Sequence, residues 1–97
     1  MNTQTDHYMQ QLCQALIAID TPELAQDFLS NILTPYELEE ITRRLQIVKL
    51  IEHGLPQREI AERLNVSIAT VTRGSRELKY GRPGFQEILK RIESASD

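Results

Sequence analysis

Residues 57–79 read QREIAERLNVSIATVTRGSRELK and have the pattern of two short helices joined by a tight turn. Small Ala61 and Ala69 are placed where two helices can approach closely. Asn65 lies between the two helical patterns, and asparagine adopts the left-handed backbone more readily than most residues. The apolar residues recur at helical spacing, at Ile60, Leu64, Val66, Ile68, Val71 and Leu78. The stretch therefore predicts a helix-turn-helix, with a first helix over 57–64 and a second over about 68–79.

The second helix of this motif is predicted to begin after Ser67, whose hydroxyl is a suitable N-cap. The apolar spacing leaves short hydroxyl, methyl and guanidinium side chains exposed on this helix, at Ala69, Thr70, Thr72, Arg73 and Arg76. Side chains of these kinds fit the major groove of a DNA duplex. An ordinary helical hairpin with a solvated polar face is the alternative. DNA binding is favoured, because the spacing, the turn residue, the cap and the basic residues all agree.

The charge distribution supports this interpretation, although the whole chain carries a net charge of −3. Residues 1–42 contain seven acidic residues and no lysine or arginine. Residues 43–82 contain nine basic and four acidic residues, which gives this block a net charge of +5. Affinity for phosphates depends on local charge, so the acidic segment is expected to face away from DNA.

The rest of the chain predicts four more helices and no strand. The first runs from about residue 7 to Asp20, with an apolar stripe that includes Leu12 and Leu16. The sequence TPEL, from Thr21, is the start signal of a short second helix. TPYE, from Thr34, is a second start signal and a capping box, and it opens a long apolar helix over about 35–53. Gly54 ends that helix, and a last short helix is expected over about 85–92.

Length and composition predict a single domain of 97 residues that pairs with a second copy. So short a chain cannot bury the apolar faces of six helices by itself. A dimer also presents two reading helices to half-sites about one DNA turn apart. The dimerisation core is expected over about 7–53 and 85–93. No apolar run reaches the length of a membrane span, and the polar N-terminus does not resemble a signal peptide, which predicts a cytoplasmic protein.

Catalysis and metal binding are not predicted. Cys13 is the only cysteine, and no CxxC motif or histidine cluster surrounds it. His7 and His53 lie in unrelated contexts, without a carboxylate pair, a nucleophile motif or a glycine-rich phosphate loop. An enzyme is therefore the least favoured class, and no cofactor is expected beyond a small-molecule effector. A protein-interaction module is also less favoured than a DNA-binding protein, because of the basic block.

The segments LTPYELEEITRRLQIVKLIEHG and QREIAERLNVSIATVTRGS resemble the bacterial tryptophan repressor family. The resemblance covers roughly residues 31–79, and LTP, RRLQIV, QRE and IATVTRGS carry it in combination. It implies an all-helical, intertwined homodimer that binds operator DNA. It also implies that L-tryptophan acts as corepressor and sets the orientation of the DNA-reading heads.

The resemblance also implies a ligand site. Arg44 and Arg73 match the two arginines that hold the family's indole ring, and Thr34 matches the threonine near the ligand carboxylate. Val48 would line the pocket and Gly74 would leave room for the ring. The ligand ammonium would be received by carbonyls at the end of the second helix of the other subunit, at Asn31, Ile32 and Leu33. Taken singly, these residues also have ordinary roles, as a cap, a solvated charge, a packing glycine or a phosphate contact.

Glu77 departs from the family, since its tryptophan binders have a serine at this position. A carboxylate here could repel the ligand carboxylate or pair with its ammonium, so both readings stay open. The preferred hypothesis is a homodimeric, DNA-binding transcriptional repressor that responds to L-tryptophan. The runner-up is a related regulator that senses another ligand or none. Gln57 and Arg58 would contact phosphates, while the second helix would face bases and backbone through Ile68, Ala69, Thr70, Thr72 and Arg73.

Overall fold

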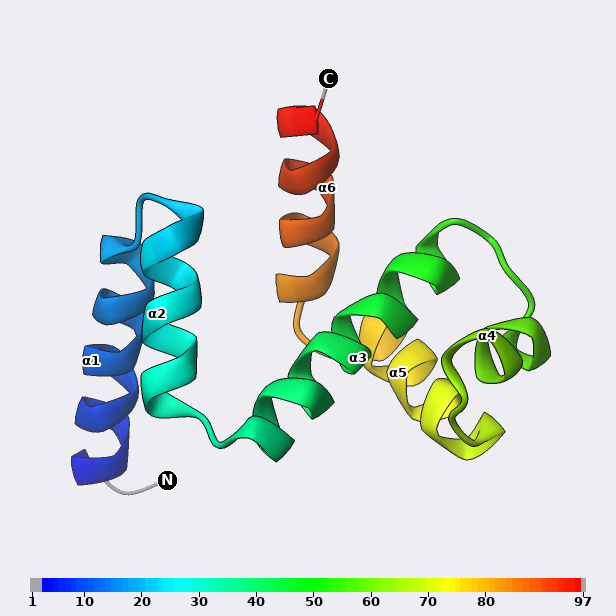
Figure 1. The fold of residues 1–97 in the computed structure, drawn as a ribbon, viewed down its shortest axis with the longest axis horizontal. Coiled ribbons are helices and arrows are strands. Elements are labelled where there is room, and N and C mark those ends of the chain that lie inside the picture. The colour runs from blue at the N-terminus through cyan, green and yellow to red at the C-terminus, as the bar shows by residue number, and fades with distance from the viewer. Residues whose placement is uncertain (1–2, 97) are drawn as a thin grey trace. The chain divides into compact units, whose positions relative to one another are not determined.

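The structure is a computed structural model that describes residues 3–96, and these residues form six helices and no strand (Figure 1). In chain order the helices are α1 (Thr3–Ala18), α2 (Pro22–Ile32), α3 (Pro35–Glu52), α4 (Gln57–Leu64), α5 (Ile68–Tyr80) and α6 (Gly84–Ser96). The described chain divides into two compact units, residues 3–38 and residues 39–96.

The first unit contains α1, α2 and the first turn of α3. Thr21 caps α2, because its hydroxyl oxygen accepts a hydrogen bond of 3.1 Å from the backbone N–H of Leu24, and Pro22 occupies the first helical position. Helix α2 therefore begins where the sequence predicted. Neither α1 nor α2 contains a buried residue, although both carry apolar stripes. The apolar side chains of this unit are left partly exposed, among them Tyr8, Met9, Leu12, Leu16, Leu24 and Ile32.

The predicted capping box at the start of α3 is formed. The backbone N–H of Thr34 donates to Oε1 of Glu37 at 2.9 Å, and the backbone N–H of Glu37 donates to the Thr34 hydroxyl at 3.1 Å. The hydrogen bond from the Thr34 backbone N–H lowers the pKa of the Glu37 carboxyl below its usual value, since it stabilises the ionised form.

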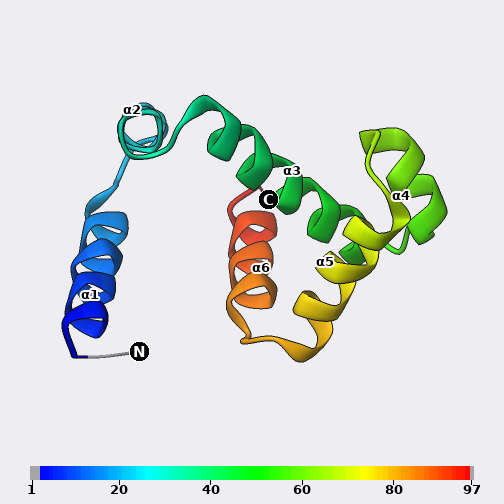
Figure 2. The same ribbon diagram turned by 90° about the horizontal axis from the view of Figure 1, so that it is seen from below.

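The second unit is organised around the rest of α3, and Figure 2 shows α4, α5 and α6 gathered around that helix. Ile47 of α3 packs with Ile60 and Ala61 of α4 and Val71 of α5 in one buried cluster. Asn65 ends α4 with φ 56° and ψ 49°, which is the left-handed conformation predicted for the turn. Ser67 caps α5 by accepting a hydrogen bond of 3.1 Å from the backbone N–H of Thr70. The helix-turn-helix geometry over 57–80 therefore follows from the local signals in the sequence.

A second buried cluster joins α6 to α3 and α5, through Val48, Leu78 and Leu89. Phe85 packs against this cluster. The side chain of Gln86 donates a hydrogen bond of 2.9 Å to the carbonyl of Leu78, which ties the start of α6 to the end of α5. Gly54, with φ 87°, follows the end of α3 as predicted.

Some details of the sequence-based prediction were wrong. Helix α1 begins at Thr3 and not at about residue 7. The prediction missed its first turn because that turn is polar and shows no apolar periodicity. The helix ends at Ala18 and not at Asp20, because the chain must leave the helix before the Thr21 cap. Helix α6 continues to Ser96, past the predicted end at about residue 92. The prediction missed this part because the segment is polar and shows no apolar periodicity. Ile68 is 50 % exposed and does not belong to the core, because it lies in the first turn of α5 on the outer face. Ala69 is also exposed, so it does not mediate close helix contact.

Candidate functional site: a pocket behind the α5 helix

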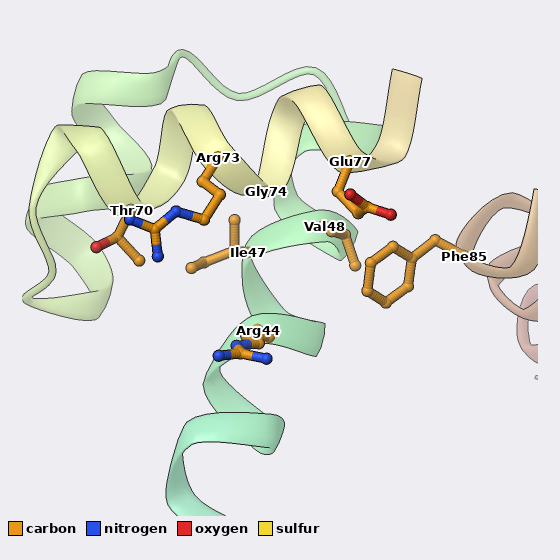
Figure 3. A pocket seen from close by; sticks show the side chains of 8 residues that line it. All are labelled: Arg44, Ile47, Val48, Thr70, Arg73, Gly74, Glu77 and Phe85. Carbon is orange, nitrogen blue, oxygen red and sulfur yellow. The ribbon is translucent and has the colours of Figure 1, made fainter. Parts of the chain in front are cut away.

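A pocket of about 430 Å³ lies between α3, α5 and the start of α6, entirely within the second unit (Figure 3). Its floor is apolar and its edges are charged. It is lined by Arg44, Ile47 and Val48 of α3, by Thr70, Arg73, Gly74 and Glu77 of α5, and by Phe85 of α6.

Two guanidinium groups face the pocket from opposite sides. Figure 3 shows Arg44 on α3 and Arg73 on α5, with Ile47 between them. Arg44 also forms an exposed ion pair with Glu40 at 3.5 Å. Arg73 makes no ion pair within the part of the chain that the structure describes. A guanidinium plane can stack on an aromatic face and can also donate hydrogen bonds to a carboxylate.

Gly74 allows α5 to pack closely on α3 at the floor of the pocket. A methyl group on Gly74 would lie 2.8 Å from Cγ2 of Ile47, which is closer than side chains pack. Ile47 is only 2 % exposed and is branched at Cβ, so it cannot easily move away. The ordinary packing role of this glycine therefore has direct structural support, and Gly74 also lines the pocket.

Glu77 and Phe85 form the other end of the pocket. In Figure 3 the Glu77 carboxylate points toward the Phe85 ring and away from Arg73. Glu77 is exposed and makes no ion pair with any other residue in the described part of the chain. The pocket thus combines positive charge at one end, an apolar middle and negative charge at the other end.

The outer face of α5 forms a second candidate surface, a shallow depression of about 890 Å³. It is lined by Ile68, Ala69, Thr72, Arg73, Arg76, Glu77, Tyr80 and Gly81. Most of the predicted DNA-contacting residues of α5 are therefore on one exposed face. Arg58, near the start of α4, is also exposed. Short polar side chains and guanidinium groups on an exposed helix face can read base edges and hold phosphates.

Three of the predicted DNA contacts also make hydrogen bonds within the protein. The Thr72 hydroxyl donates to the side-chain carbonyl of Gln57 at 2.8 Å, in a partly buried position. The amide nitrogen of Gln57 stays available as a donor in this arrangement. The Thr70 hydroxyl lies 2.8 Å from the Ser67 hydroxyl, and Thr70 lines the pocket and not the outer depression.

The structure brings together five of the predicted ligand-binding residues, namely Arg44, Val48, Arg73, Gly74 and Glu77. Asn31, Leu33 and Thr34 belong to the first unit, where Asn31 is in the last turn of α2, Leu33 is its C-cap and Thr34 is in the capping box. Their contribution to a ligand site stays a prediction.

Ile47, Thr70 and Phe85 were not predicted as pocket residues, and Thr70 was predicted only as a DNA contact. Ile47 is one helical turn from Arg44, so the spacing could have identified it. Phe85 is on a separate helix, and its position depends on how α6 packs.

Other kinds of site receive no support from the described residues. Residues 3–96 contain no group of three or more histidine, cysteine, aspartate or glutamate side chains with the arrangement of a metal site. None of the helices in this range is both long enough and apolar enough to span a membrane. Cys13 is an exposed free thiol on α1.

Comparison with known proteins decides the family. Residues 7–93 match the family described as Trp repressor protein. The chain belongs to this family. It is 51 % identical over 67 residues to a protein named Trp operon repressor homolog from Mannheimia succiniciproducens, a match that covers 68 % of this chain and 66 % of that protein. A protein of the same name from Chlamydia caviae is 47 % identical over 75 residues, with 76 % and 74 % of the two chains covered.

A solved structure of a TrpR-like protein from Eubacterium eligens has a TM-score of 0.83 to this structure at 28 % identity, covering 90 % of both chains. The predicted all-α Trp repressor fold is therefore confirmed. The prediction that this chain is not an enzyme is also confirmed, since the matched family is described as Trp repressor protein and the relatives are named Trp operon repressor homolog.

Proposed function

We propose that this Trp repressor family member is a homodimeric, sequence-specific DNA-binding transcriptional repressor with L-tryptophan as its corepressor. Membership of the family and the names of its relatives support the repressor function. One structural observation supports the coupling of ligand binding to DNA binding. The same helix, α5, presents the exposed basic face on one side and forms a wall of the pocket on the other.

This arrangement couples ligand binding to DNA binding through the orientation of α5. A ligand between Arg44 and Arg73 contacts both α3 and α5, so it favours one orientation of α5 over others. Two α5 helices in a dimer must match two half-sites of operator DNA at once. A small change in their orientation therefore changes operator affinity.

In the proposed complex, Gln57 and Arg58 hold DNA phosphates from the start of α4, and the outer face of α5 reads the bases. In the pocket, Arg44 and Arg73 stack on the indole ring. Arg73 also donates to the ligand carboxylate, with Thr34 near that group. Val48 and Gly74 line the ring, and carbonyls at Asn31 and Leu33 of the second subunit receive the ammonium, at a helix end that carries partial negative charge.

A second candidate is a repressor with the same DNA-binding head that takes another ligand or none. Glu77 is the observation that favours it, because this exposed carboxylate lines the pocket in which the ligand carboxylate would be held. Calorimetry with L-tryptophan, combined with DNA selection in its presence and absence, distinguishes the two candidates.

The test uses reciprocal coupling. Tryptophan should raise operator affinity by the same factor by which operator DNA raises tryptophan affinity, since both sites belong to one thermodynamic cycle. Arg44→Ala should lose most ligand affinity and keep ligand-free DNA binding, because Arg44 is outside the helix-turn-helix. Arg73→Ala should weaken both. Tight, sequence-selective DNA binding that tryptophan does not change would rule out the corepressor and leave the second candidate.

A matched pair of variants tests the DNA face. Arg58→Ala should weaken binding to all duplexes. The slope of the logarithm of DNA affinity against the logarithm of salt concentration should fall in magnitude by about one unit, since one phosphate contact is lost. Lys90→Ala, the same kind of charge loss on α6, should leave the slope unchanged. Equal salt-dependence slopes for wild type and Arg58→Ala would show that Arg58 does not contact DNA phosphates.

A further inference from the structure

Arg73 and Glu77 are opposite charges one helical turn apart on α5, yet they do not form an ion pair. The other helix surfaces of the described chain have four arginine–glutamate pairs at this spacing, at 39/43, 40/44, 59/63 and 87/91. In each of those pairs the glutamate precedes the arginine. Arg73 and Glu77 have the reverse order, which is the less favourable orientation along a helix. In this order the two side chains gain little from pairing with each other.

The consequence is a pocket with a free charge at each end. Figure 3 shows the Arg73 guanidinium pointing toward Thr70, and the Glu77 carboxylate pointing toward Phe85, with Gly74 between them. Gly81 contributes to this arrangement. A Cβ at Gly81 would be closest to Oε1 of the Glu77 carboxylate and to the backbone carbonyl oxygen of Glu77, so glycine leaves room for both groups.

The middle of the pocket is apolar, with Ile47 and Val48 along it, and Phe85 adds an aromatic ring next to Glu77. Ile47 and Val48 are almost fully buried, so they provide a fixed surface for an apolar or aromatic body. A ligand with such a body can direct a charged substituent toward either end, and in an α-amino acid the two charged groups lie side by side on one carbon. An anionic group is stabilised at the Arg73 end and a protonated amine at the Glu77 end, while a second anionic group near Glu77 is repelled.

We infer that Glu77 is a specificity-determining residue, and that it selects ligands that carry a protonated amine over carboxylic acids that lack one. The inference rests on the proposed function, because it concerns the effector pocket of the repressor. It adds a carboxylate of the same subunit to the helix-end carbonyls of the second subunit as an acceptor for the ammonium, which has three N–H donors. The ligand class is then an aromatic amine or amino acid.

Three indole compounds test this selection by calorimetry. They share one ring system and differ in charge: L-tryptophan carries both groups, tryptamine only the amine, and indole-3-propionate only the carboxylate. Each is titrated at low ionic strength into wild type and Glu77→Gln, which keeps the size and a hydrogen-bonding group and removes the charge. Glu62→Gln is the matched control, because Glu62 is an exposed residue of α4 outside the pocket.

In Glu77→Gln, affinity for tryptamine and tryptophan should fall about tenfold, as expected for the loss of a charge-assisted hydrogen bond at an exposed position. Affinity for indole-3-propionate should rise severalfold. The ratio of tryptamine to indole-3-propionate affinity should therefore fall in Glu77→Gln and stay at the wild-type value in Glu62→Gln. Thermal unfolding of each variant verifies that the fold is intact.

The outcomes separate the inference from the proposed function. If the indoles bind and the ratio is the same in wild type and Glu77→Gln, the selection by Glu77 is wrong and the corepressor proposal stands. If the ratio of tryptamine to indole-3-propionate affinity changes equally in Glu62→Gln, the effect comes from the loss of any negative charge, and the selection by Glu77 is again wrong. If none of the three compounds binds either wild type or Glu77→Gln, both the selection and the indole corepressor are wrong.

Discussion

Two residues of the described chain outside the helices take a left-handed backbone, Gly54 at φ 87° and Asn65 at φ 56°. Both were predicted from residue type and position, because few other residues tolerate this conformation. Gly74 is different. Its small size was evident in the sequence, but only the packed structure shows that Ile47 occupies the space beside it. Single residues are thus predictable when local backbone geometry determines them, and less so when a distant side chain does.

Gly74→Ala should destabilise the protein. The added methyl group clashes with Cγ2 of buried Ile47, and overpacking of this kind costs typically about 1 to 3 kcal/mol. The higher helix propensity of alanine offsets up to about 1 kcal/mol of this. Denaturant unfolding measures the difference. In an Ile47→Leu background, which lacks Cγ2, the same substitution should cost less, and an equal cost in both backgrounds would show that this contact is not the cause.

The capping box at Thr34 and Glu37 should make stability depend on pH. Its hydrogen bond lowers the pKa of the Glu37 carboxyl in the folded state, so the stabilisation is complete above the usual glutamate pKa and is lost as pH falls through the folded-state value. Thermal unfolding from about pH 6 down to about pH 3 should therefore show wild type losing its advantage over Glu37→Gln. Glu23→Gln, in the first turn of α2, is the control. A constant difference between wild type and Glu37→Gln over this range would contradict the prediction.

At the scale of elements, the sequence predicted six helices and placed the two helices of the predicted helix-turn-helix almost correctly, because apolar spacing and caps coincide there. Helix ends without apolar residues were placed less well, as in the first turn of α1 and the last turn of α6. The candidate pocket was predicted only through family resemblance. No local pattern relates Arg44 to Glu77 or Phe85, because three separate helices must pack before these residues meet.

The α4 and α5 helices should depend on one side-chain hydrogen bond for part of their mutual stability. α4 has eight residues and no side-chain N-cap, and Thr72 of α5 donates to Gln57 at its first position. A double-mutant cycle with Thr72→Val and Gln57→Met should give a coupling free energy of roughly 0.5 to 1.5 kcal/mol. Thr42→Val on α3 should show no coupling to Gln57→Met. Additive effects of Thr72→Val and Gln57→Met would mean that the hydrogen bond adds nothing to stability.

At the scale of the whole molecule, the two units differ in how they are stabilised. Residues 39–96 contain two buried apolar clusters, whereas α1 and α2 contain no buried residue in the single chain. An amphipathic helix without a buried face gains little from folding alone, since most helical stability in proteins comes from packing of the apolar face. The proposed dimer supplies that packing, and it also places two α5 helices against two DNA half-sites.

The protein should therefore be a dimer whose N-terminal helices depend on assembly. On α1 the stripe to be covered includes Tyr8, Leu12 and Leu16, which are 58 %, 37 % and 47 % exposed. Light scattering at micromolar concentration should give twice the chain mass of 11.2 kDa. Leu12→Asp should weaken the dimer at least about tenfold, because burying an unpaired carboxylate costs several kcal/mol. Gln11→Asp adds the same charge one residue away from the stripe and should leave the mass unchanged. A folded wild-type monomer, or equal dissociation by both variants, would show that this apolar face is not the dimer interface.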